Sequence, residues 1–471
     1  MHALSQRIAD VLALQPEGAA IEYDGVWSTW QQVAVLANRI ATMGESEVGM
    51  LLRNRPTHVA ALLGVLLGGG TVVTINRSRG DDRTRSDVAE LDLSAIIGDP
   101  DDLTSMVPAG PTAIAIPSLD AAPQLPAPGA CRSGVAVRML TSGTTGPPKR
   151  IDLTYDMLAH SVITAAAPTE PRRGVAIVNA PLVHIGGVFR VLQCICEARP
   201  FVLLERFELN RWADAVRRHR PRTVSLVPAA LRTVLHSGLK PEDLESIRAV
   251  TSGTAPLSAD DADAFTEKFG IPVLTSYAAT EFGGGVAGWS LTDYQSHWRA
   301  KRGSVGKASL GARLRVVDDS GSPLDADRAG LLEVKPGQLG PTADWIRTTD
   351  MARIDADGFL WILGRADQAI IRGGFKVMPD DVRAALEGHA AVQGAAVVGQ
   401  PDDRLGETPV AMVELREPVD TATLLDYLRT RLARYEIPTR ITVVDQIPRT
   451  PSGKADLGAV RRFFSDAVDH A

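Results

Sequence analysis

Short apolar runs rich in β-branched residues alternate with stretches of helical periodicity from the N-terminus to about residue 350. We expect the runs to be strands, because each is short and is bounded by glycine, proline or hydroxyl residues. They are TVVTI (71–75), VAVRML (135–140), GVAIVNAP (174–181), PFVLLE (200–205), TVSLVP (223–228), IRAVTSG (247–253) and IPVLTSY (271–277). This alternation predicts the α/β fold class, with layers built on largely parallel sheets.

The pattern changes towards the C-terminus. Pro379 and Asp380 indicate a helix start, and a second helix is predicted over 421–435 behind a capping Asp420. Its apolar positions share one face; they are Leu424, Leu428, Leu432 and Tyr435. These elements predict a small α+β domain of their own.

Chain length supports a division into domains. With 471 residues, the chain exceeds the size at which one hydrophobic core usually stops growing. We predict a large N-terminal domain over 1–364, a connection at 365–368 and a small C-terminal domain over 369–471. The Pro-rich segment 107–129 is expected to be a surface connection within the large domain.

Composition narrows the class of protein. The apolar share is 45%, the charged share is 23% and the formal net charge is −6, which is typical of a soluble globular protein and offers no overall basic surface for nucleic acid. The basic cluster at 217–222 is expected to be a solvated helix end. We therefore expect no nucleic-acid partner.

Cysteine usage and apolar runs bear on localisation. Three cysteines, Cys131, Cys194 and Cys196, form no disulfide framework and lack metal-ligand spacing. The N-terminus predicts an amphipathic helix without signal-peptide features. The apolar run at 59–76 carries three successive glycines, so a buried helix, a turn and a strand explain it better than a membrane span. A cytoplasmic protein without a membrane span is expected.

The segment LTSGTTGPPKR, residues 140–150, has the composition of a phosphate-binding loop: glycines, hydroxyls and a lysine. It is not a Walker loop, because Pro148 stands where the second glycine should be and Arg150 where a hydroxyl should follow the lysine. Alone, it is equally well a polar connector between two strands. Similar hydroxyl-rich segments, TSGTAP (251–256) and TSYAATE (275–281), follow other predicted strands, where ligands of α/β proteins bind.

Further short segments follow in a fixed order: PLVHIGG (181–187), SGTAPL (252–257), SYAATE (276–281), GSVGK (303–307), RTTD (347–350), GR (364–365), GGFK (373–376) and PRTPSGK (448–454). Together with the loop at 140–150 they resemble the adenylate-forming superfamily of acyl-CoA synthetases, peptide-synthetase adenylation domains and luciferases. The resemblance covers the chain from about Val135 onward. It implies a large layered domain, a small mobile C-terminal domain, and a site that uses ATP, Mg²⁺ and coenzyme A.

The resemblance also implies which residues bind the nucleotide. The loop wraps the phosphates, Tyr277 carries the adenine, Asp350 grips the ribose and Arg365 helps to hold the nucleotide. The implied ATP- and AMP-binding residues are Thr141, Ser142, Gly143, Thr144, Thr145, Gly146, Lys149, Ser252, Gly253, Thr254, Ala255, Pro256, Tyr277, Ala278, Asp350 and Arg365. Taken singly, Asp350 and Arg365 are more typical of a surface ion pair, and Tyr277 of packing.

For catalysis the resemblance implies Glu281 as magnesium ligand, Thr280 beside it, and Lys454 as the cation that bridges carboxylate and α-phosphate. Such a site suits a reaction in which charge develops on a five-coordinate phosphorus. Asp367 matches the pivot of a hinge at 365–368. After rotation about it, a tunnel for the pantetheine thiol is implied at Gly373, Gly374 and Lys376. The implied acyl pocket consists of His184, Gly186, Gly187, Ala278 and Gly283.

Three positions depart from the family pattern, since Arg150, Ala278 and Thr349 stand where glycine is usual. A substituted glycine at positive φ would cost about 1 kcal/mol. The methyl of Ala278 is expected to narrow the acyl site, and Arg150 either reaches phosphate or points to solvent.

The predicted function is that of an AMP-forming carboxylate–CoA ligase acting on a monocarboxylic fatty, alicyclic or aromatic acid. Two alternatives stay open: transfer of the acyl group to a carrier-protein thiol, and a nucleotide-binding protein without catalysis. The compact stretch from Gly364 to Lys376 favours CoA, because family members that stop at acyl-AMP often carry an insertion there. Joint retention of Lys454, Glu281, Asp350 and Arg365 argues against a silent protein.

Overall fold

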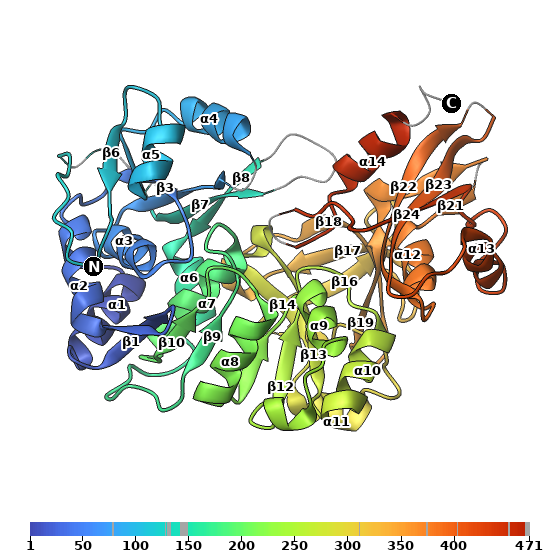
Figure 1. The fold of residues 1–471 in the computed structure, drawn as a ribbon, viewed down its shortest axis with the longest axis horizontal. Coiled ribbons are helices and arrows are strands. Elements are labelled where there is room, and N and C mark those ends of the chain that lie inside the picture. Colours follow the sequence, from blue (N-terminus) through green and yellow to red (C-terminus); the bar gives the residue numbers. More distant parts are fainter. Residues whose placement is uncertain are drawn as a thin grey trace.

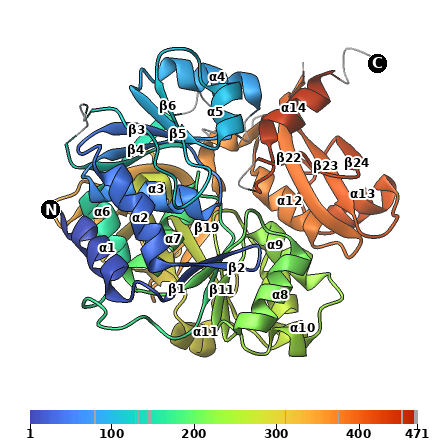
Figure 2. The ribbon, with the colours of Figure 1, turned by 60° about the vertical axis from the view of Figure 1, so that its left-hand side comes forward.

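The structure is a computed structural model of the chain, and it describes residues 1–77, 80–127, 129, 133–141, 149–309, 311–373, 375–402, 404–450 and 453–466. Five sheets with flanking helices form a large α/β body and a smaller lobe at its side, drawn in orange to red in Figures 1 and 2. The predicted α/β class with a large N-terminal and a small C-terminal part is confirmed.

The first sheet contains six strands and carries most of the N-terminal third. Its order is β6 (Thr112–Ala115), β5 (Ala95–Gly98), β3 (Glu47–Leu51), β4 (Thr71–Ile75), β7 (Val135–Thr141) and β8 (Lys149–Thr154). All neighbours are parallel except β7 and β8. Contrary to the sequence-based expectation, the Pro-rich segment contributes a strand, β6, because TAIA pairs in register with β5.

The second sheet packs beside the first, in the order β2 (Val26–Thr29), β1 (Ala19–Tyr23), β10 (Phe201–Leu203) and β9 (Ala176–Val178). Apolar helix faces close one large core around these strands. The helices of this half are α1 (Ala3–Leu14), α2 (Trp30–Ala41), α3 (Pro56–Leu67), α4 (Asp81–Glu90), α5 (Pro100–Met106), α6 (Tyr155–Val162) and α7 (Ile185–Cys196). The glycine-interrupted run is indeed helix α3, a turn and strand β4, and within the described residues no helix could cross a membrane.

The third sheet holds the middle of the chain, in the order β11 (Thr223–Ser225), β12 (Ala249–Ser252), β13 (Val273–Ala279), β14 (Gly284–Gly288) and β15 (Lys307–Ala308). Its parallel part, β11 to β13, packs on helices through a second core. These helices are α8 (Leu209–His219), α9 (Pro228–Leu235), η2 (Pro241–Leu244), α10 (Ala259–Phe269) and α11 (Leu291–His297). The basic cluster ends α8, where Asp243, Asp214 and Glu22 pair with it, as expected of a helix end.

The fourth sheet is antiparallel throughout, in the order β16 (Arg313–Val317), β17 (Gly330–Lys335), β18 (Ile346–Ile354) and β19 (Leu360–Arg365). The short helix η3 (Thr280–Phe282) precedes this sheet in the chain, and η4 (Gly337–Leu339) lies between β17 and β18. The prediction of largely parallel sheets is therefore wrong for this part. The connections between its successive strands contain no α-helix, and each strand pairs with the preceding strand in the antiparallel direction.

The small lobe, residues 369–466 as described, follows η5 (Ala366–Gln368). Its sheet has the order β21 (Phe375–Val377), β20 (Ile370–Arg372), β23 (Gly406–Leu415) and β22 (Val392–Asp402), with β24 (Arg440–Val444) beside β23. Helices α12 (Pro379–Glu387), α13 (Thr421–Arg429) and α14 (Leu457–Asp466) cover it. We call these residues the small domain.

Helix α13 is shorter than predicted. Asp420 caps it as expected, accepting from the Thr423 amide at 2.7 Å, but the helix ends at Arg429. Leu432 and Tyr435 lie beyond its end and still pack on the same core. The prediction of a buried apolar face is therefore confirmed, and the prediction of one helix to residue 435 is wrong. The segment after Arg429 is not part of the helix, yet its apolar side chains pack on the same core.

Candidate functional site

Two parallel strand ends form one wall of the candidate site. Strands β12 and β13 pair through Ser252 and Thr275, so the segment after Ser252 lies against the middle of β13. The approach is close: a Cβ on Gly253 would stand 2.8 Å from the Ser276 hydroxyl oxygen. Ser252 is buried, and its hydroxyl has no hydrogen-bond partner among the described residues. Two of the predicted nucleotide-binding segments therefore meet here.

Thr254 has an unusual backbone. Its φ is +70°, in the left-handed region that β-branched residues avoid. Ala255 is half-buried and Pro256 is exposed. Residues held in this way cost of order 1–3 kcal/mol and concentrate at functional sites. The turn that carries Thr254 is thus strained at the place where the sequence predicts a nucleotide-binding segment.

Tyr277 and Asp350 form a short hydrogen bond. The Tyr277 hydroxyl donates to Asp350 Oδ2, and the Asp350 amide donates to the Thr348 hydroxyl at 3.0 Å. Burial raises the pKa of Asp350, while the Tyr277 hydroxyl and the charge of Arg365 oppose that shift. Burial also raises the pKa of Tyr277, reinforced by the Asp350 charge. Among the described residues, the Asp350 carboxylate thus accepts a hydrogen bond from one neutral donor, the Tyr277 hydroxyl.

Arg365 ends β19 opposite Asp350, its partner in the antiparallel register. Its guanidinium grips Asp367 in a two-pronged pair, with Nε–Oδ1 at 2.8 Å and Nη2–Oδ2 at 2.6 Å. This pair raises the pKa of Arg365. The predicted nucleotide residue and the predicted pivot residue are therefore joined at the connection between the large body and the small domain.

Lys454 comes from the small domain, on a turn that begins at Thr450. The Thr450 amide donates to the Lys454 carbonyl at 2.7 Å, and the Gly453 amide donates to the Thr450 carbonyl at 2.8 Å. Gly453 has φ +82°, which suits glycine. Pro451 of the PRTPSGK segment lies outside the described residues.

The turn carries Lys454 to the large-domain residues named above. Desolvation by the surrounding protein lowers the pKa of Lys454, and the charge of Arg365 lowers it further. The charges of Asp350 and Glu281 act in the opposite direction. The side chain stays open to solvent. One cation from the small domain therefore shares an electrostatic environment with two predicted carboxylates of the large domain.

His184 faces the same cation. It is the N-cap residue of α7, and its Nε2 atom is buried without a hydrogen-bond partner among the described residues. Burial, with a contribution from the Lys454 charge, lowers the pKa of His184 to about 4. The imidazole is therefore neutral at pH 7 and has unused hydrogen-bonding capacity.

The glycines assigned to the acyl pocket differ in their surroundings. A Cβ on Gly187 would lie 2.1 Å from the Pro181 carbonyl oxygen, and one on Gly283 would lie 2.7 Å from Met157 Cε, whereas Gly186 faces open space. Two polar residues that sequence reasoning missed hold this wall. Ser161 donates to the Gly283 carbonyl, and the Gln338 amide donates to the Gly285 carbonyl at 2.7 Å. Nothing in the sequence near them signalled this role.

The predicted phosphate loop and thiol tunnel are described in part. Ser142, Gly143, Thr144, Thr145 and Gly146 of the loop lie outside the described residues, as does Gly374. The backbones of Thr141 and Lys149 flank the loop in β7 and β8, and Lys376 lies in β21. Gly373 has φ +56°, and its amide donates to the Leu405 carbonyl at 2.7 Å.

The three departures from glycine carry no backbone strain. None of Arg150, Ala278 and Thr349 has a positive φ. Arg150 neither points to solvent nor stands free for phosphate, since its Nη2 pairs with both Asp87 oxygens at 2.8 and 2.7 Å and its Nη1 donates to the Thr74 carbonyl. That residue therefore ties β8 to α4.

No group of three or more His, Cys, Asp or Glu side chains in the described part of the chain could hold a metal ion. Glu281 is a single exposed carboxylate in η3. Mg²⁺ commonly takes one or two carboxylates and completes its shell with substrate phosphates and water. One carboxylate at this site fits an ion that arrives with a nucleotide.

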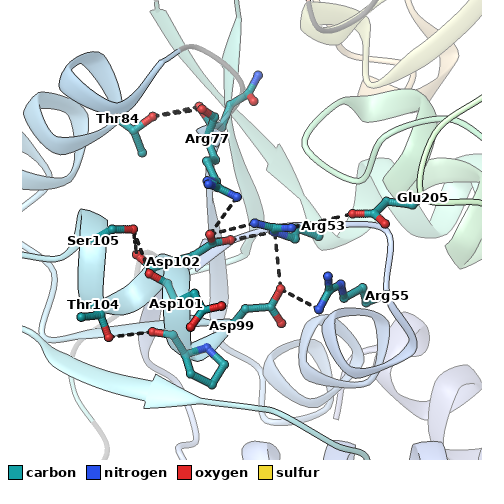
Figure 3. Close-up of polar contacts among 12 residues, drawn as sticks. Arg53, Arg55, Arg77, Thr84, Asp99, Asp101, Asp102, Thr104, Ser105 and Glu205 are labelled. Atoms are coloured by element: carbon teal, nitrogen blue, oxygen red, sulfur yellow. Dashed lines mark hydrogen bonds and ion pairs between the residues drawn. The ribbon is translucent and has the colours of Figure 1, made fainter.

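A second polar cluster lies at the ends of β3 and β5 (Figure 3). Arg53 grips Asp102 with Nε–Oδ2 at 2.7 Å and Nη2–Oδ1 at 2.8 Å, and Arg77 adds a bond at 2.9 Å. Arg55 pairs with Asp99 at 3.1 Å. No local sequence pattern indicated this cluster, because these residues come from three separate segments of the chain.

Comparison with known families agrees with this arrangement. A family model described as AMP-binding enzyme matches residues 8–340, and one described as AMP-binding enzyme C-terminal domain matches residues 381–454. A feruloyl-CoA synthase of Amycolatopsis sp is 29% identical over 483 aligned residues, covering 96% of this chain and 97% of the relative. A 2-succinylbenzoate–CoA ligase of Bacillus subtilis is 30% identical over 339 residues, covering 68% of this chain and 67% of the relative.

Solved structures have the same fold over the full length. The o-succinylbenzoate CoA synthetase of Bacillus subtilis, in complex with its acyl-adenylate intermediate, has a TM-score of 0.81 and 25% identity and covers 98% of each chain. ATP-bound MatB of Rhodopseudomonas palustris has a TM-score of 0.84 at 24% identity, covering 99% of this chain and all of that one. These proteins agree with the predicted class, an AMP-forming acid–thiol ligase that uses ATP, Mg²⁺ and coenzyme A. The chain belongs to the AMP-binding enzymes, within the adenylate-forming superfamily.

Proposed function

We propose that the protein is an ATP-dependent carboxylate–CoA ligase. It converts a carboxylic acid and ATP into acyl-AMP and pyrophosphate, and then converts acyl-AMP and CoA into acyl-CoA and AMP. The observation that carries the proposal is the position of Lys454, which the small domain brings under the influence of Glu281, Asp350 and Arg365. A purely structural lysine has no reason to approach this group of large-domain residues.

The proposed roles follow from the chemistry of each side chain. Asp350 accepts hydrogen bonds from the ribose hydroxyls, since its raised pKa and single phenol donor leave acceptor capacity. Tyr277 and the segment 252–256 enclose the adenine. Glu281 would hold Mg²⁺, which neutralises phosphate charge when bound. Lys454 orients the carboxylate against the α-phosphate, and a neutral His184 borders the acyl group.

The proposed two-step reaction needs the small domain in two orientations. We assign the pivot to 365–368, where Asp367 holds Arg365, and we keep 1–364 and 369–471 as the proposed domains. The thiol of CoA would approach through Gly373, Gly374 and Lys376. A carrier-protein thiol is the alternative acceptor, and the absence of an insertion between β19 and β21 favours CoA.

For the substrate we propose a monocarboxylic acid, with an aromatic acid as the first choice over fatty and alicyclic acids. Support comes from apolar and glycine-rich lining, and from relatives named for ferulate and 4-coumarate. One observation favours a second candidate, an acid with a further anionic group. Arg190 lies on α7, the helix that carries Gly186 and Gly187. Its Nη1 donates to Gln193 Oε1 at 2.7 Å, and its Nε atom is buried without a hydrogen-bond partner among the described residues.

The test is acid-dependent pyrophosphate release by the purified protein with Mg-ATP, with and without CoA, followed by mass spectrometry of the products. The panel contains short, medium-chain, hydroxycinnamic and dicarboxylic aromatic acids. Acyl-CoA and AMP formed from one class support the proposal and identify the acid. Accumulation of acyl-AMP despite CoA moves the acceptor to a carrier protein, and absence of turnover with every acid overturns ligase function.

A further inference from the structure

An ion-pair network crosses from the large body to the small domain at a distance from the proposed chemistry. Arg232 on α9 donates through Nη2 to Glu387 Oε2 on α12 at 3.0 Å. It also pairs through Nε with Asp261 Oδ2 on α10 at 2.6 Å. The side chains are largely buried, with 12% of Arg232, 12% of Asp261 and 5% of Glu387 exposed. Charges this well shielded from solvent interact more strongly than surface pairs.

Each end of the cross-domain bond has a second partner in its own domain. Arg232 keeps Asp261 if the small domain leaves. Glu387 keeps Arg383, whose Nη1 lies 2.7 Å from the same carboxylate oxygen, and accepts from the Ala395 amide at 3.3 Å. Leaving a buried charge without a partner typically costs 3–5 kcal/mol, and this arrangement avoids that cost. The bond between Arg232 and Glu387 can therefore open and close without stranding a charge.

The network is connected to Lys454 through helix α9. The N-cap residue of that helix, Val227, lies against the lysine turn: a Cβ placed on Gly453 would be 3.9 Å from Val227 Cγ2. Arg232 lies further along the same helix. The small domain thus meets α9 at two points, and one of them is the turn that carries Lys454. The bond between Arg232 and Glu387 therefore also restrains the turn that carries Lys454.

We propose that the Arg232–Glu387 ion pair is a reversible latch that holds the small domain in the orientation in which Lys454 reaches the active site. This inference rests on the proposed function, because it assigns the latch to the first half-reaction, acyl-AMP formation. Arg232 and Glu387 are positioning residues and do not touch the reacting atoms. Arg416 faces the same network: burial lowers its pKa, Arg232 acts in the same direction, and Asp261 and Glu387 oppose the shift.

The test separates the two half-reactions. Formation of acyl-AMP is measured in single turnover with the best acid of the panel and Mg-ATP, and consumption of preformed acyl-AMP is measured with CoA. For Arg232→Ala we expect a roughly tenfold slower first step and a second step within twofold of the unchanged protein. Arg232→Lys, which keeps the charge, restores most of the rate, and Glu387→Gln slows the first step less than Arg232→Ala does.

Combined variants and a matched control sharpen the result. Adding Glu387→Gln to Arg232→Ala slows the first step no further, because the bond is already absent. Arg217→Ala removes an ion pair of similar length, 2.9 Å to Asp243, that lies entirely within the large domain, and it leaves both half-reactions unchanged. The inference is overturned if Arg232→Ala slows both half-reactions equally, or if it changes neither by more than twofold.

A second measurement does not need activity. Hydrogen exchange followed by mass spectrometry reports the docking of α9 on α12 in the full-length protein. We expect peptides covering 228–235 and 379–387 to exchange faster in Arg232→Ala, while peptides from β12 and β13 keep the exchange rate of the unchanged protein. Unaltered exchange at both helices overturns the latch. If the unchanged protein forms no acyl-AMP with any acid, the proposed function fails, and the exchange result still decides whether this bond holds the two domains together.

Discussion

Two groups of buried carboxylates in this molecule look alike in composition and differ in how fully they are paired. In the cluster of Figure 3, Asp102 is 2% exposed and binds Arg53 and Arg77. Burial raises the pKa of Asp99, yet His58, Arg55 and Arg53 outweigh burial and lower it overall. In the candidate site, the Asp350 carboxylate has one hydrogen-bond donor among the described residues, the Tyr277 phenol, and burial raises its pKa. The complete pairing of Asp102 indicates a structural role, and the hydrogen-bonding capacity that is left over at Asp350 indicates a ligand.

Buried atoms without hydrogen bonds occur in both groups. In the cluster, Arg55 Nε and Asp99 Oδ2 lack a hydrogen-bond partner among the described residues, but Asp99 Oδ2 lies 3.1 Å from Arg55 Nη1 and 3.4 Å from Arg53 Nε, so its charge is balanced within the cluster. Around the candidate site, Ser252 Oγ and His184 Nε2 are buried without hydrogen-bond partners among the described residues. Buried polar groups are nearly always paired, so such exceptions require an explanation. A bound nucleotide and acyl group would supply the missing partners. The comparison predicts that substitutions at the Arg53 cluster reduce stability, while substitutions at the site reduce binding or rate.

The largest expected effect is that of Lys454→Ala on acyl-AMP formation. Loss of one preorganised charge at a reacting group typically costs 100- to 1000-fold, and we expect a decrease of about that size. Because Lys454 is solvent-exposed at the end of a turn, the unfolding temperature should change little. Single-turnover acyl-AMP formation and calorimetric AMP binding measure the two quantities. Equal loss of rate and of AMP affinity would contradict a role confined to the reaction.

Asp102→Asn tests the other side of the comparison. It leaves two arginines facing a neutral side chain in a nearly buried place, so we expect the free energy of unfolding to fall by about 3 kcal/mol. Urea denaturation measures it. The matched control is Asp82→Asn, whose pair with Arg85 is 97% exposed on the carboxylate side and should matter by less than about 0.5 kcal/mol. Similar losses for both substitutions would show that the cluster adds no stability of its own.

The lowered pKa of His184 predicts a pH dependence of stability. Its value in the folded protein is about 4, below the ordinary 6.5, so the unfolded chain binds the proton more tightly. The stabilisation is present above pH 6.5 and is lost as the pH falls towards 4, by about 2 kcal/mol between pH 7 and pH 5. Comparing urea denaturation of the unchanged protein with that of His184→Asn isolates this contribution. Parallel losses in both proteins would place the titration elsewhere.

Much of the fold and part of the site could be predicted from the sequence. Strand β4 has its predicted bounds, 71–75, because a short β-branched run between a glycine turn and a polar segment has few other solutions. The order of segments such as SGTAPL and SYAATE led to residues that the structure brings together at β12 and β13. Each such segment is a short continuous stretch of sequence that follows a strand, so its residues can be recognised without knowledge of the fold.

What could not be predicted depends on contacts between distant segments. The partner of Arg150 is Asp87, 63 positions away, and no local pattern distinguished this pair from a phosphate contact. Arg53 and Arg77 meet Asp102 only because parallel strands bring their ends together. The same holds for Arg232 and Glu387, 155 positions apart. Charged side chains carry no periodic signal, so their pairing requires the fold.

Asp350→Asn tests whether the free hydrogen-bond acceptor capacity of this carboxylate is used to bind the ribose. The amide keeps the shape of the side chain but loses the charge and one acceptor, so we expect AMP to bind about 10- to 100-fold more weakly. Titration calorimetry with AMP measures the affinity. Asp357→Asn provides a control, since its pair with Lys301 lies at an exposed turn and should leave AMP binding unchanged. Undiminished AMP affinity in Asp350→Asn would remove the ribose role from this residue.

The smallest effect expected is that of Thr254→Gly. Thr254 holds φ at +70°, and glycine adopts this conformation freely, although it also gains freedom in the unfolded chain. Relief of backbone strain stabilises the variant, and the greater freedom of its unfolded chain destabilises it. We therefore expect a net gain in unfolding free energy of no more than about 1 kcal/mol. If the strained turn is set up to enclose adenine, AMP affinity falls two- to threefold at the same time, because the glycine turn is less rigid.

A second left-handed residue in the large body gives the control for Thr254. Asp327 has φ +63° in the turn between β16 and β17, away from the proposed nucleotide site. Asp327→Gly should change stability by a similar small amount and leave AMP affinity unaltered. Unaltered AMP affinity in both variants would make the strain at Thr254 an ordinary property of a turn. A loss confined to Thr254→Gly would mean that the backbone energy stored there is used to preform the adenine site.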